Sequence, residues 1–210
     1  MGVLGCRNLK EHLFDDSLSV GSIAEKFVKQ YYKHIFKKVI PKFANVLSLD
    51  YYENDYAKEL QRKGIDGFIE SIIPFEVKTR DHKYYQNQDI LLEIMAENEN
   101  NKLGWLYTSE SKIIVYLWYN EKRDYFIDGY LLFLENIRKW LPGREGKYQK
   151  GKTTSASGNY KWTTISLFVP IKDFPNNCLE RIPVKTFSKR IKKTPRMAIP
   201  PTIDLGEVIG

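Results

Sequence analysis

Cysteine and histidine are both scarce in this chain, which contains two cysteines and three histidines among its 210 residues. Cys6 and Cys178 are too few and too distant in sequence to define a disulfide framework, as is typical of proteins from a reducing compartment. His12, His34 and His82 have no mutual spacing suited to a shared metal ion. A histidine-based zinc site is therefore not expected.

Long apolar runs are also absent. No run approaches the roughly 18 residues that a membrane-spanning helix requires, and the N-terminus lacks the charged-then-apolar pattern of a secretion signal. We therefore expect a soluble protein of the cytoplasm that does not bind membranes.

Acidic residues are outnumbered by basic ones, 26 to 33, which gives a formal charge of +7. The excess is clustered: residues 181–196 contain seven Lys or Arg and no acidic residue, and residues 138–161 are almost as one-sided. Such clusters favour a polyanionic partner such as DNA. A solvated surface or a disordered end is the alternative for both clusters, and for the tail it explains the charge equally well.

Hydrophobic residues make up 42% of the chain, enough for one core, so we expect one domain over residues 1–180 and a basic, Pro-containing tail over 181–210. Helices are predicted from Ser22 to Pro41, from Asp55 to Lys63 and from about Tyr130 to Leu141, with a long polar loop after Pro142. The predicted strands cover residues 68–70, 72–80, 90–95, 113–119 and 163–169. The sum is an α/β fold around a mixed sheet.

Two carboxylates and an ammonium group are expected to meet at one point of this sheet. In the strand that contains Phe75 to Lys78, the period of two places Glu76 and Lys78 on the same face. Asp66 lies in the turn before the preceding strand, and pairing of the two strands would bring it beside Glu76. Carboxylate oxygens suit Mg²⁺, and a lysine beside the metal can orient water or stabilise charge on a phosphate. This combination suits phosphodiester hydrolysis.

The Glu-x-Lys pattern alone is weak evidence, because it also occurs at Glu110–Lys112 and Glu145–Lys147. Neither of these copies lies within an apolar strand that follows an acidic turn, so the context selects Glu76. The alternative for the selected copy is an ordinary cross-strand ion pair on the outer face of a half-exposed strand, and we favour the site over it.

The residues Asp66, Glu76 and Lys78 resemble the motif of the PD-(D/E)XK nuclease superfamily, with Ile65 where the motif has proline. The resemblance covers about the first two thirds of the chain, and the layout is most similar to archaeal Holliday-junction resolvases and to nucleases of archaeal spindle-shaped viruses. It implies a restriction-endonuclease-like mixed β-sheet flanked by helices. The implied activity is an Mg²⁺- or Mn²⁺-dependent DNA endonuclease that acts as a homodimer, in the host cytoplasm if the protein is viral.

The resemblance also implies further members of the site. Asp66, Glu76 and the Val77 carbonyl would bind the metal, Lys78 would activate water, and Glu25 from the first helix would assist. For Glu25 an N-terminal capping role, Ser22-x-x-Glu25, is equally compatible with the sequence. Glu93 is another candidate ligand or supporting acid, which a sheet-edge ion pair would explain as well.

Residues 146–153 match the phosphate-binding loop of nucleotide hydrolases, with Lys152 as the phosphate ligand. The context differs, because that loop requires a strand before it and a helix after it. We favour a flexible basic loop that contacts DNA. The expected DNA-binding residues are Lys147, Lys150, Lys152, Lys161, Lys189, Arg190, Lys192 and Lys193. The alternative function is a DNA-binding protein that does not cut.

Several aromatic residues invite a role in base stacking. They alternate with Ile and Val, as a buried sheet requires, so a place in the core is favoured. These residues are Trp105, Tyr107, Tyr116, Trp118 and Tyr119.

Overall fold

The computed structural model describes residues 8–13, 21, 23–28, 46–48, 55–69, 73–122, 125–157 and 160–182. The predictions for Ser22, for residues 29–41 and for the basic residues of the tail lie outside these ranges. The latter are Lys189, Arg190, Lys192 and Lys193.

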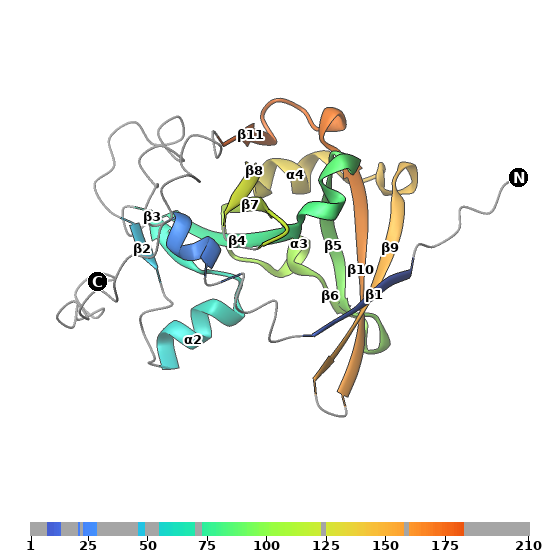
Figure 1. The fold of residues 1–210 in the computed structure, drawn as a ribbon, viewed down its shortest axis with the longest axis horizontal. Coiled ribbons are helices and arrows are strands. Elements are labelled where there is room, and N and C mark those ends of the chain that lie inside the picture. Colours follow the sequence, from blue (N-terminus) through green and yellow to red (C-terminus); the bar gives the residue numbers. More distant parts are fainter. Residues whose placement is uncertain are drawn as a thin grey trace, which may run out of the picture.

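The described strands form two mixed sheets (Figure 1). In the first sheet the order is β11 (Leu179–Arg181), β8 (Phe126–Phe133), β7 (Ile113–Tyr119), β4 (Ile73–Asp81), β3 (Gly67–Ile69) and β2 (Val46–Ser48). In the second sheet it is β1 (Asn8–Leu13), β9 (Gln149–Ser157), β10 (Tyr160–Pro170), β5 (Asp89–Glu97) and β6 (Lys102–Leu103). The parallel pairs are β4 with β7 and β1 with β9.

Helical segments join and cover the sheets, which confirms the predicted α/β class. The α-helices include α2 (Asp55–Arg62), α3 (Trp105–Thr108) and α4 (Leu134–Trp140). Short 3-10 helices are η2 (His82–Asn87), η3 (Asn98–Asn100), η4 (Glu145–Lys147) and η5 (Ile171–Asp173). Residues 23–28 are also helical.

Strand β7 is the centre of the core because it is buried on both faces. One face carries Ile113, Val115 and Leu117, which share a cluster with helical residues 23–28. The other face carries Ile114, Tyr116 and Trp118, which pack against β5 and β10 of the second sheet. Each fully buried aliphatic or aromatic side chain contributes about 1.5–3 kcal/mol relative to an exposed one, so this strand anchors both layers.

The turn between α2 and β3 places Asp66 at its position. Helix α2 ends at Arg62, and Gly64 takes a positive φ of 72° that reverses the chain. This left-handed conformation favours glycine, as the predicted cap requires. Ile65 is buried against Ala57, and the Asp66 amide donates to the Phe75 carbonyl at 2.8 Å. The predicted pairing of β3 with β4 is confirmed, with Gly67 opposite Phe75.

Two predicted segments differ from the structure. Residues 130–133 were expected in a helix, but they complete β8, which pairs along its length with β7 before α4 begins at Leu134. The polar loop expected after Pro142 is largely strand β9, which pairs with β10 from Gln149 to Ser157. In both segments pairing with a neighbouring strand overrides the local preference of the chain.

The strands also divide between two sheets, whereas a single sheet was expected. Strand β5 (Asp89–Glu97) belongs to the second sheet, where it lies between β10 and β6. Its residues Ile90 and Leu92 are buried against the first sheet. The second sheet thus lies directly over the strand that carries Glu76 and Lys78.

The fold continues through Ile182, which is buried and donates its amide to the Gly129 carbonyl at 2.8 Å. Arg181 binds Asp128 through Nε at 3.1 Å and Nη2 at 2.8 Å. Within the described ranges, no helix has the length and apolar character needed to cross a membrane.

Candidate active site

Asp66 extends the edge of β4 beyond the end of β3. The last β3 pair joins Gly67 to Phe75, and one step further the Val77 amide donates to Asp66 Oδ2 at 2.6 Å. The amide and carbonyl of one strand residue face the same neighbour. The Val77 carbonyl therefore lies on the edge of β4 that Asp66 occupies.

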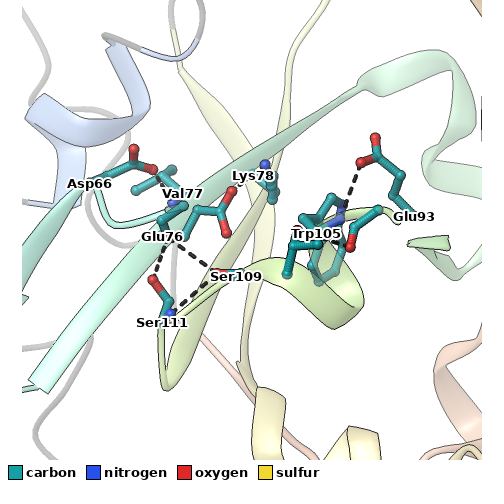
Figure 2. Close-up of polar contacts among 11 residues, drawn as sticks. Asp66, Glu76, Val77, Lys78, Glu93, Trp105, Ser109 and Ser111 are labelled. Atoms are coloured by element: carbon teal, nitrogen blue, oxygen red, sulfur yellow. Dashed lines mark hydrogen bonds and ion pairs between the residues drawn. The ribbon is translucent and has the colours of Figure 1, made fainter. Parts of the chain in front are cut away.

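Glu76 and Lys78 lie on the same face of β4, as predicted, and Glu76 Oε1 forms an ion pair with Lys78 Nζ (Figure 2). The Glu76 side chain is only 6% exposed, whereas that of Lys78 is 31% exposed. The second oxygen, Glu76 Oε2, is buried with no hydrogen-bond partner. A buried carboxylate oxygen in this state is costly unless a cation or a donor satisfies it.

The charge of Lys78 is set by three carboxylates. Burial alone would lower the pKa of Lys78, but the ion pair with Glu76 and two further carboxylates raise the pKa above its usual value. These two carboxylates belong to Asp66 and Glu93. Lys78 is therefore held as an ammonium ion at the point where the three acidic groups meet.

Glu93 reaches this point from β5 of the second sheet. Its Oε1 accepts a hydrogen bond from the Trp105 amide at 3.2 Å, and the Trp105 ring centroid lies 5.8 Å from Lys78 Nζ (Figure 2). Burial raises the pKa of Glu93 above its usual value, while the charge of Lys78 and the Trp105 amide oppose this effect. From the sequence, Glu93 could equally be a ligand or supporting acid of the site or a member of a sheet-edge ion pair.

The floor of the site consists of residues that sequence reasoning missed. Ser109 and Ser111, both buried, donate from their hydroxyls to the Gly64 carbonyl. Arg138 of α4 donates from Nε to the Leu106 carbonyl and from Nη2 to the Ser109 carbonyl, each at 2.6 Å. These contacts fix the segment after α3 beneath Glu76. No local pattern marks them, because they join residues that are distant in sequence.

Of the three aromatic residues of β7, Tyr116 and Trp118 are buried in the core and Tyr119 packs against it, as expected. Trp105 also packs against the core, and its ring in addition faces Lys78. Tyr107, on the same short helix, is 43% exposed.

The oxygen donors on β4 and at its edge fit a hard divalent cation. Oxygen ligands are available from Asp66, Glu76 and the Val77 carbonyl. The buried Glu76 Oε2 has no hydrogen-bond partner, so a cation would compensate its charge. Among the described residues, no group of three or more His, Cys, Asp or Glu has the arrangement of a metal site. Mg²⁺ does not require one, because it commonly binds through one or two carboxylates and keeps several waters.

Glu25 is half-buried within helical residues 23–28. Its neighbours Ala24, Phe27 and Val28 pack in one cluster with Phe75. Residues of odd and even number on β4 point to opposite faces, so this helix covers the face opposite to Glu76. The assisting role of Glu25 stays a prediction.

The expected DNA-binding lysines of the described chain are all exposed. Lys147 lies in η4, Lys150 and Lys152 lie on β9, and Lys161 lies on β10. Thr153 follows Lys152 within the same strand, and β9 leads into β10 rather than into a helix. The segment therefore lacks the strand-loop-helix arrangement of a nucleotide-binding loop, which disfavours the nucleotide hydrolase alternative.

Compared with models of known protein families and with curated proteins, the chain matches none.

Proposed function

We propose that this protein is a metal-dependent DNA endonuclease with its active site at Asp66, Glu76 and Lys78. One observation supports this more than any other. The Val77 amide donates a hydrogen bond to Asp66 Oδ2 at 2.6 Å. The neighbouring residue, Glu76, forms an ion pair with Lys78 through its carboxylate. An ordinary surface ion pair would leave both partners exposed, whereas Glu76 is buried and has one oxygen without a partner.

Each of these residues has a chemical task. Asp66, Glu76 and the Val77 carbonyl would hold Mg²⁺ or Mn²⁺, which supplies an activated water and polarises the phosphate. Lys78 would stabilise negative charge on the phosphate oxygens, and its partly buried position strengthens that interaction. No nucleophilic side chain is needed.

The exposed lysines of β9 and β10 would contact DNA phosphates. Lys150 and Lys152 are two residues apart on β9, so they project from the same face of the strand. The chain would then be a member of the PD-(D/E)XK superfamily. Within it, the chain would be most similar to the archaeal junction resolvases and the spindle-shaped virus nucleases. It also includes a homodimer, because cutting two strands requires two active sites; light scattering would measure the assembly.

Cleavage of a panel of single-stranded, duplex, flapped and four-way DNA in Mg²⁺ or Mn²⁺ tests the proposal. We expect cleavage that stops on chelation. Glu76→Gln should remove activity, and Lys78→Ala should lower kcat by about a hundredfold or more while Mn²⁺ binding persists.

The second Glu-x-Lys pattern provides matched controls. Glu110 and Lys112 are both exposed, so Glu110→Gln and Lys112→Ala should cut at the rate of the unaltered protein. Metal-independent cleavage, or full activity of Glu76→Gln, would contradict the proposed site. DNA binding without cleavage by the unaltered protein would instead favour the alternative of a binding protein that does not cut.

A further inference from the structure

Lys78 is enclosed from two sides, by Glu76 of its own strand and by a corner of the second sheet. This corner consists of Glu93 on β5 and Trp105 at the start of α3. The Trp105 amide binds Glu93 Oε1 at 3.2 Å, and the Trp105 ring faces Lys78 Nζ with 5.8 Å to the centroid (Figure 2). One residue thus fixes the Glu93 carboxylate and also contacts the lysine.

The corner depends on a close approach of two backbones at Gly104. The Gly104 amide donates to the Ile94 carbonyl at 2.9 Å. A Cβ at this position would lie 2.3 Å from the Glu93 carbonyl oxygen and 2.8 Å from its Cγ. Glycine is therefore required here, and the contact leaves the Glu93 side chain little freedom.

A carboxylate in such a place needs a counter-charge. The charge of Lys78 opposes the rise in the Glu93 pKa that burial causes, and the charge of Glu93 in turn raises the pKa of Lys78. The two groups therefore stabilise each other's charged forms across the two sheets. Among the described residues, Glu76 is the only one that an ion pair joins to Lys78, and Glu93 acts on Lys78 at longer range.

We propose that Glu93 is a positioning residue of the site, which holds the Lys78 ammonium from the second sheet when Glu76 binds a metal ion. The inference rests on the proposed nuclease function. A metal ion on Glu76 withdraws negative charge from Lys78, and Glu93 remains to keep the ammonium in its place. Glu93 acts through Lys78 and does not bind the metal.

The test compares Glu93→Gln with Glu97→Gln. Glutamine at 93 keeps an oxygen for the Trp105 amide but removes the charge. Glu97 is a matched control on the same strand, with its own ion pair to Lys102 at 2.7 Å. We expect Glu93→Gln to lower kcat by about tenfold, with KM for DNA and the Mn²⁺ binding midpoint within about twofold of the unaltered protein. Glu97→Gln should change none of these values.

A double-mutant cycle gives a readout that does not depend on activity. In the metal-free protein, Glu93→Gln should leave the melting temperature unchanged or raise it slightly, because burial raises the pKa of Glu93 and the charge of Lys78 offsets only part of that cost. In a Lys78→Met background the same change should raise the melting temperature by more, since Glu93 is then buried without its counter-charge, and the difference between the two changes measures the coupling. The double variant should also cut no more slowly than Lys78→Met alone. Glu93→Asp keeps the charge and should retain more activity than Glu93→Gln.

Several outcomes would overturn the inference. They are a kcat of Glu93→Gln equal to that of the unaltered protein, additive losses in the double variant, or an Mn²⁺ midpoint raised tenfold or more, which would make Glu93 a metal ligand. If Glu93→Gln does not fold, a kcat of Glu93→Asp as low as that of Lys78→Met would overturn it. Absence of metal-dependent cleavage by the unaltered protein would overturn the proposed function and this inference together.

Discussion

At the scale of single residues, the site is built around a carboxylate in an unusual state. Glu76 has one oxygen in an ion pair and the other buried without a donor. Leaving a buried polar atom unsatisfied costs about 1–3 kcal/mol, more for a charged group. Such a cost is expected where a protein keeps a group ready for a ligand, because the missing interaction forms only on binding.

Gly64→Ala should inactivate the site, because the new Cβ would lie 2.8 Å from Glu76 Oε2. Gly143 is a matched control, since both glycines have positive φ but no atom lies within 4 Å of a Cβ at Gly143. Each substitution costs on the order of 1–2 kcal/mol for its left-handed conformation. We therefore expect lower stability in both variants and loss of cleavage in Gly64→Ala alone, as measured by urea unfolding and a cleavage assay. Equal cleavage by the Gly64→Ala and Gly143→Ala variants would show that the position of the Glu76 carboxylate does not depend on the absence of a side chain at Gly64.

At the scale of elements, the segments with a strong local pattern were predictable. The run from Ile113 to Tyr119 is apolar without interruption and forms β7 with the predicted bounds. Helix α2, with Gly64 after it, was predicted from its capping glycine. The division into two sheets was not predictable, because it depends on which strands pair, and pairing partners leave no mark on the local sequence.

The same distinction applies to the candidate site. Glu76 and Lys78 share one strand and Asp66 lies in the turn before the adjacent strand, so the period of two and one short turn were enough to bring them together. Glu93 comes from the second sheet, whose position over β4 follows from long-range packing, and Trp105 comes from helix α3, which contacts that sheet. Arg138 supports the site by donating hydrogen bonds to the carbonyl oxygens of Leu106 and Ser109. A contact to the backbone leaves no pattern in the sequence.

Strand β9 offers a test of the element that the sequence assigned to a loop. A Cβ at Gly151 would lie 2.2 Å from Phe168 Cε2, whereas a Cβ at Gly146, just before the strand, would meet no atom within 4 Å. Gly151→Ala should therefore lower the free energy of unfolding by about 1–3 kcal/mol, the usual cost of overpacking. Gly146→Ala should have little effect in the same urea titration. Equal stability of the two variants would indicate that residues 149–157 do not pair with β10.

At the scale of the whole molecule, a charge of +7 matters only where it is concentrated. Two regions compete for the DNA-binding role, the strand β9 with its exposed lysines and the segment after Ile182. The predicted tail began at residue 181, but Arg181 binds buried Asp128 and Ile182 belongs to the core, so both residues are part of the fold. A truncation meant to remove only charge should therefore begin at residue 183.

The salt dependence of DNA binding distinguishes these regions. Each Lys or Arg that neutralises a phosphate contributes about 0.9 to the slope of log affinity against log salt for duplex DNA. If both β9 lysines touch phosphates, Lys150→Gln with Lys152→Gln should reduce the slope by about 1.8. Lys58→Gln with Lys122→Gln removes the same charge from other exposed positions and should leave the slope nearly unchanged.

Deletion of residues 183–210 removes six Lys or Arg, and contact by half of them would reduce the slope by about 2.7. The truncated protein should still cut saturating DNA at low salt, because Asp66, Glu76 and Lys78 are untouched. An unchanged slope after truncation, together with a reduced slope in the β9 variant, would assign DNA binding to β9. The opposite pair of results would assign it to the segment after Ile182, and equal slopes in every variant would exclude both.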